Sequence, residues 1–240
     1  MHLYSDSNNK KHVMAERMLD PGIPSNLCNL FIYQVLDYTV LSLYSALSKN
    51  FVGYKVLMNT PSLDEDPLMS QTYNSKFMVS SDPDFELIPK AFNADVSDNF
   101  SPDLVVNTAL KKTDVHLAYG IEKYSESLES PAVWLFVHEN IVSVIISNHK
   151  SLVFANSFTF NDQTELLYFV VSALNITDIK QDDARVYLDY AAMNKFGLSD
   201  FLQPYFKSVE PLVLPFENPD PELDILPVLL APNHLASLCV

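Results

Sequence analysis

Apolar residues in the chain gather into two sets of three short runs. The first set begins at Leu30 with LFIYQV, TVLSLYSAL and FVGYKVL, and the second begins after Pro131 with AVWLFVH, IVSVIIS and SLVFANSFTF. Apolar runs of this length, separated by a few polar residues, are typical of strands joined by tight turns. The pattern therefore predicts two antiparallel meanders of three strands, alike in length and order.

The period of the apolar positions changes after the second meander. Leucine and valine recur from Leu166 to Leu174 along one stripe of a helix. Asp162, with Glu165 three residues later, has the pattern of a capping box at the start of this helix. A short strand, RVYLDY, and a helix over 194–207 follow, so residues 131–210 are predicted as a βββαβα subdomain.

The first half continues less regularly after its meander. Helices are expected over 63–73, 87–92 and 122–128, together with strands at MVSS and DVHLAYGI. This order is compatible with βββαβαβα. Residues 27–130 are therefore predicted as the first subdomain.

The two ends of the chain differ in composition from both halves. Residues 1–26 are mainly polar and predict an N-terminal arm with a short helix over 13–19. Residues 211–240 are rich in proline and acidic residues. We expect this C-terminal tail to run over the surface as an extended clasp or to be disordered.

The charge balance restricts the partners of the protein. The 240 residues include 30 acidic and 15 basic ones, which gives a net charge of −15. This charge repels nucleic acid and anionic membrane surfaces, so neither is an expected partner. No window reaches the roughly 18 apolar residues of a membrane span, and no hydrophobic signal segment precedes the first run. Cys28 and Cys239 are expected as free thiols in a reducing cytoplasm, although one disulfide between them stays open.

Three stretches of the sequence resemble a family of uncharacterised bacterial proteins. They are SLVFANSFTFNDQTELLYFVVSAL from Ser151, ELIPKAF from Glu86 and DVHLAYGIEKYSESL from Asp114, and the resemblance covers residues 27–210. The duplicated meander is similar to the ribonuclease H-like halves of the actin-like ATPase superfamily. The resemblance implies an α/β fold of two ribonuclease H-like subdomains with mixed sheets. It brings no established activity and no catalytic residues.

The resemblance to actin-like ATPases also implies where a nucleotide would bind. In that superfamily ATP lies between the halves, and the first hairpin of each half contacts its phosphates through a pattern such as Asp-x-Gly-Ser/Thr. Glycine is needed because backbone N–H groups converge on a phosphate only where side chains are out of the way. The candidate nucleotide-binding residues here are Asp37, Thr39, Glu139 and Asn140. Neither turn contains any of the four glycines, so ordinary polar turn residues are the favoured interpretation.

Metal-dependent nuclease chemistry is a second alternative for a ribonuclease H-like fold. Acids at strand ends, here Asp37, Glu122 and Asp189, are the residues that would hold two metal ions. The net charge of −15 disfavours a polyanionic substrate. The six histidines show no metal-ligand spacing, and no Gly-x-Ser-x-Gly motif marks a nucleophile. No catalytic and no metal-binding residue is therefore predicted.

These features together predict a non-catalytic protein with a degenerate nucleotide site. It is expected to bind an unidentified protein partner or to serve as a scaffold, and no cofactor is expected. The alternative is a protein that binds or hydrolyses ATP with Mg²⁺ and holds the phosphates with side chains such as Thr39, Asn140 and Asn156.

Overall fold

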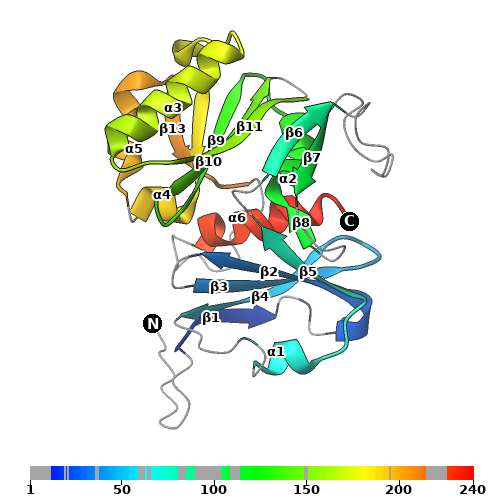
Figure 1. Ribbon diagram of the computed structural model, residues 1–240. Helices are drawn as coiled ribbons and strands as arrows, with labels where there is room; N and C mark the ends of the chain where they lie inside the picture. The colour runs from blue at the N-terminus through cyan, green and yellow to red at the C-terminus, as the bar shows by residue number, and fades with distance from the viewer. Residues whose placement is uncertain are drawn as a thin grey trace.

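The protein consists of two lobes, each built on one mixed β-sheet, which stand one above the other in Figure 1. The structure is a computed structural model. It describes residues 12–18, 20, 22–35, 38–58, 63, 66–80, 85–89, 104–108, 114–148, 151–194, 196–214 and 226–240.

The sheet of the first lobe has six strands in the order β1-β4-β3-β2-β5-β8. Its centre is the antiparallel meander predicted from the sequence, and β5 and β8 continue the sheet in parallel to β2. The strands are β1 (His12–Met18), β2 (Cys28–Val35), β3 (Tyr38–Ser45), β4 (Phe51–Met58), β5 (Ser75–Ser80) and β8 (Asp114–His116).

The sheet of the second lobe repeats this arrangement in the order β11-β10-β9-β12-β13. The first three strands form the second predicted meander, and β12 and β13 are parallel to β9. The strands are β9 (Ala132–His138), β10 (Ile141–Asn148), β11 (Ser151–Thr159), β12 (Arg185–Leu188) and β13 (Ser208–Pro211). The repeated order confirms the predicted α/β fold with two ribonuclease H-like sheets.

Smaller elements connect and cover the two sheets. A two-stranded sheet of β6 (Phe85–Pro89) and β7 (Leu104–Thr108) lies beside β11. The helices are α1 (Pro67–Ser70), α2 (Leu117–Ser125), α3 (Gln163–Ile176), α4 (Tyr190–Asn194), α5 (Leu198–Leu202) and α6 (Leu226–Ser237). The described residues also include the 3₁₀ turns η1 (Ser25–Leu27), η4 (Gln181–Asp183) and η5 (Gln203–Tyr205).

Helix α3 begins where the capping pattern predicts. The Glu165 backbone N–H donates to Asp162 Oδ1 at 2.8 Å, and the Asn161 backbone N–H donates to Glu165 Oε2 at 2.9 Å. Two of the backbone N–H groups at the start of the helix are thereby satisfied. The apolar stripe of α3 packs on β10 and β11.

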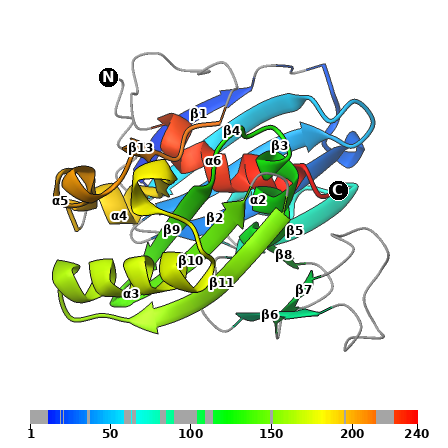
Figure 2. The same cartoon turned by 90° about the horizontal axis from the view of Figure 1, so that it is seen from above.

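Helices α2 and α6 lie between the lobes, and each packs on the sheet of the other half (Figure 2). Helix α2 follows the first sheet but contacts β10 and β11, whereas α6 follows the second sheet but contacts β2 and β3. In α6 the fully buried Asn233 donates through Nδ2 to the Val40 carbonyl at 2.9 Å and to Ser42 Oγ at 3.0 Å. The two helices approach so closely that a Cβ on Gly120 would lie 2.3 Å from the carbonyl oxygen of Leu235. This pair of exchanged helices holds the lobes together.

Several predicted elements are wrong. Residues 12–18 form strand β1 on the edge of β4, not a helix, and 85–89 pair with β7. The strand expected from Asp114 ends at His116, where α2 begins. The helix over 194–207 is interrupted at Gly197, which has φ 59°. For residues 12–18 and 85–89, pairing with distant segments overrides the local pattern.

The expectation for the C-terminal tail is also wrong for its described part, because residues 226–237 form the buried helix α6. Pro227 lies in the first turn of α6, where backbone N–H groups have no intrahelical acceptor. The missing N–H of proline therefore costs no hydrogen bond. Pro232 lies inside the helix and is itself buried. The subdomain boundaries at 130 and 210 stay predictions.

Candidate functional site

In the first hairpin, the pairing of β2 with β3 extends to Val35 and Tyr38. Asp37, one of the candidate nucleotide-binding residues, lies outside the described residues. Thr39 lies on β3, opposite Gln34 and Leu57, and is buried with 2% of its surface exposed. The hydroxyl of Thr39 is therefore enclosed in the sheet and does not stand at the tip of the turn.

The second hairpin has the same spacing between its last paired residues, since His138 pairs with Ile141 across Glu139 and Asn140. Both turn residues are exposed, and Glu139 adopts a positive φ of 53°, a conformation that favours glycine. The Asn140 carbonyl accepts a hydrogen bond from the Phe160 N–H at 2.9 Å. The backbone of this turn is thus tied to the end of β11.

A contact between two tyrosines connects the first hairpin to the second lobe. The Tyr190 hydroxyl donates to the Tyr38 hydroxyl at 3.3 Å, and the rings meet edge to face with centroids 5.2 Å apart. Burial, followed by the hydrogen bond that Tyr190 donates to Tyr38, raises the pKa of Tyr190 to about 12. Tyr190 is the first residue of α4, directly after the end of β12. Figure 1 shows the hairpin and α4 on the same side of the molecule.

The neighbouring acid, Asp189, is buried with 2% of its surface exposed. Its Oδ1 accepts the Ala192 N–H at 2.8 Å, and its Oδ2 accepts the Val137 N–H at 3.3 Å. Loss of hydration raises the pKa of Asp189 to about 7, although these backbone N–H groups act in the opposite direction. The carboxyl group ties α4 to β9.

A series of contacts thus leads from one hairpin to the other: Tyr38, Tyr190, Asp189 and Val137, which lies on β9 close before the second turn. In open α/β sheets, ligands bind outside the carboxyl ends of the strands, and Asp189 and Tyr190 follow the carboxyl end of β12.

The sequence prediction omitted Tyr190 from the site. The polar pair Asp189 and Tyr190 at the end of the predicted strand RVYLDY was the available signal.

Asn156, the third side chain considered for phosphate, does not lie at the turns. It pairs with Val144 in the middle of the β10–β11 ladder, whereas the residue opposite the start of β10 is Thr159. Its Oδ1 accepts the backbone N–H of Ser157 at 2.8 Å. The structure therefore separates Asn156 from Asn140.

The carboxylates considered for metal binding do not form a cluster among the described residues. Glu122 lies in α2 and not at a strand end, so its predicted position is wrong. Both oxygens of Asp189 already accept backbone N–H groups. Within the part of the chain that the structure describes, no group of three His, Cys, Asp or Glu residues could hold a metal ion.

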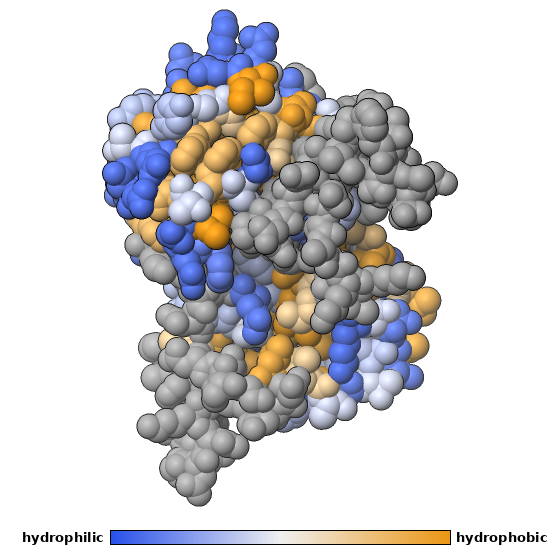
Figure 3. All heavy atoms as spheres, in the orientation of Figure 1, coloured by the Kyte–Doolittle hydropathy of each residue, from blue (hydrophilic) through white to orange (hydrophobic). Residues whose placement is uncertain are grey.

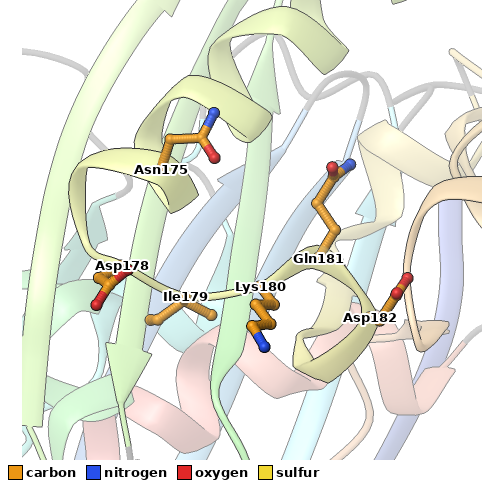
Figure 4. A pocket seen from close by; sticks show the side chains of 6 residues that line it. All are labelled: Asn175, Asp178, Ile179, Lys180, Gln181 and Asp182. Carbon is orange, nitrogen blue, oxygen red and sulfur yellow. The ribbon is translucent and has the colours of Figure 1, made fainter.

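A cavity of about 340 Å³ lies at the end of α3 (Figure 4) and is separate from the hairpins. It adjoins η4, which precedes the amino end of β12, whereas Asp189 follows the carboxyl end. Its lining residues are mostly exposed and carry both signs of charge: Asn175, Asp178, Ile179, Lys180, Gln181 and Asp182.

Comparison with solved structures assigns the class of the fold as actin-like ATPase. A Bacteroides thetaiotaomicron protein with actin-like ATPase fold and unknown function superposes with a TM-score of 0.59, at 15% identity, over 78% of this chain and 91% of that chain. The PilM–PilN type IV pilus biogenesis complex superposes with a TM-score of 0.58, at 11% identity, over 89% and 98%. At these identities the likeness shows the fold alone.

Residues 86–209 match the model of the family described as protein of unknown function DUF3822, and the chain belongs to this family. The matched segment contains the whole second meander and α3, where the sequence resemblance was recognised. No curated protein matches the sequence. Among the described helices, none combines the length and apolar character needed to span a membrane.

Proposed function

We propose that this protein is a non-catalytic member of the actin-like ATPase fold that acts by binding another protein. The observation that carries the proposal is the contact between Tyr38 and Tyr190. It joins the first hairpin to the carboxyl end of β12, in the region where the fold would otherwise admit a nucleotide between the lobes.

The chemistry of the two hairpins supports a degenerate nucleotide site. All four glycines, Gly22, Gly53, Gly120 and Gly197, lie outside both turns. Backbone N–H groups are therefore shielded by side chains where a phosphate would need them.

Thermal unfolding with and without Mg-ATP tests the proposal against the alternative of an ATP-binding protein. We expect no change in Tm. A ligand at 100 times its Kd stabilises by about 2.7 kcal/mol, which corresponds to roughly 5 to 10 °C for a chain of this size. A rise of that order that disappears in Asp37→Ala would refute the degenerate site.

The second element of the proposal is a protein partner. The PilM–PilN complex supports it as a structural neighbour in which this fold is part of a protein assembly. Affinity capture from a native lysate tests this element. Recovery of chaperones alone would contradict it.

A further inference from the structure

Four aromatic residues form a continuous face on the second lobe, which we call the aromatic face: Phe154 and Phe158 on β11, and Tyr168 and Phe169 on α3. The rings of Phe158 and Phe169 stack with centroids 4.6 Å apart, and Phe154 extends the stack at 6.4 Å from Phe158. Tyr168 meets Phe169 at 5.7 Å. The rings hold one another in place, so the face is pre-organised.

The outer edge of the aromatic face is open. Tyr168 has 66% of its surface exposed, and Ile176, two turns further along α3, has 75%. The outward side of a surface helix is normally polar. Figure 3 shows apolar atoms gathered on the front of the upper lobe, with hydrophilic residues at their border. Exposed tyrosine beside packed phenylalanine is typical of protein–protein interfaces.

The charges around the aromatic face are mainly negative. Asp162, Glu165 and Asp178 lie at the two ends of α3, and Lys180, which follows Asp178 closely, is the single basic residue in the sequence 151–182. An acidic border around an apolar centre is complementary to a basic segment and repels polyanions.

We propose that the aromatic face binds a basic segment of another protein, in which apolar side chains alternate with arginine or lysine. The apolar side chains pack on Phe158 and Phe169, and a guanidinium or ammonium group stacks on the exposed ring of Tyr168. The aliphatic stem of a second basic residue covers Ile176, while the flanking acids attract the positive charges. The proposal rests on the proposed function of protein binding and names the surface and the chemistry of the partner.

Site-specific photo-crosslinking identifies what covers this face. The photoreactive residue p-benzoylphenylalanine replaces Tyr168 in one variant and Leu47 in a matched control, because Leu47 is 83% exposed on the turn after β3 in the other lobe. Both variants are produced in the parent cells, and the crosslinked peptides are sequenced. We expect an adduct with a basic segment of another protein at position 168 alone. No adduct, an adduct with a second copy of this chain, an adduct with a neutral or acidic segment, or the same adduct at both positions would overturn the proposal.

Titration of the crosslinked segment, as a labelled synthetic peptide, gives the second test. Tyr168→Ala should weaken binding about tenfold or more, as expected for an interface anchor, and Leu47→Ala should leave it unchanged. Glu165→Gln, which keeps an oxygen for the Asn161 N–H, should weaken binding more at low salt than at high salt. Equal affinities for all three variants would overturn the aromatic face as the binding site. If Tyr168→Ala captures the partner as well as the unmodified protein does, the aromatic face is excluded as the binding site, while the proposed function of protein binding stands.

Discussion

Replacing Gly120 with alanine tests whether the close approach of α2 and α6 holds the lobes together. The added Cβ would lie 2.3 Å from the Leu235 carbonyl oxygen and 2.5 Å from its carbon. These distances are about 1 Å shorter than ordinary van der Waals contacts. Backbone cannot rotate away as a side chain can, so α6 must withdraw from the first sheet or α2 from the second.

The expected effect is the difference of two terms. Overpacking of this kind costs up to about 3 kcal/mol, while alanine is more favourable than glycine in a helix by about 1 kcal/mol. We expect Gly120→Ala to lower the free energy of unfolding by about 2 kcal/mol, which corresponds to a fall in Tm of roughly 4 to 8 °C.

Urea and thermal denaturation provide the measurement, with Gly22→Ala as the matched control. A Cβ on Gly22 would approach nothing closer than Asp20 Oδ1 at 3.4 Å, so the control should change stability by less than about 0.5 kcal/mol. If Gly120→Ala instead stabilises the protein, as it would on an exposed helix, the packing described for α2 and α6 is refuted.

Three further predictions concern acidic residues. Burial raises the pKa of Asp189 from 3.8 to about 7. The free energy of unfolding is therefore highest below pH 4, where Asp189 is protonated in both states, and it falls by about 4 kcal/mol as the pH rises to 7. Asp189→Asn should abolish this fall in the free energy of unfolding between pH 4 and pH 7. A fall of the same size in the variant would contradict the assignment to Asp189. Asp162→Ala should lower stability by about 1 kcal/mol through loss of the α3 cap; equal denaturation midpoints would exclude such a role. Asp66→Asn keeps an oxygen for the Leu68 N–H but removes the 3.2 Å ion pair with the buried Lys55, and should lower stability by about 3 kcal/mol. A loss below 1 kcal/mol would mean that Glu16, 3.4 Å from Lys55, is a sufficient partner.

The duplicated sheets could be predicted because a meander is a local structure. Its strands are neighbours in sequence, so the apolar runs and the short turns between them contain the information that pairs them. The start of α3 was predictable for the same reason, since Asp162 and Glu165 are three residues apart.

The elements that sequence reasoning missed depend on segments far apart in the chain. The β1 segment becomes a strand only because β4 offers an unpaired edge. The prolines of residues 226–237 suggested an extended tail, yet burial against β2 and β3 stabilises a helix there. The contact between Tyr38 and Tyr190 joins residues 152 positions apart, and no local pattern indicates it.

The exchange of α2 and α6 between the lobes has a consequence for synthesis on the ribosome. Helix α6 covers β2 and β3, but it follows the entire second lobe in the chain. The first sheet therefore emerges with one apolar side uncovered and stays so until more than a hundred further residues, from β4 to α6, have been translated. During that interval the nascent chain exposes the surface that chaperones recognise. Folding of the first lobe is completed only after the second, so the order of folding differs from the order of synthesis.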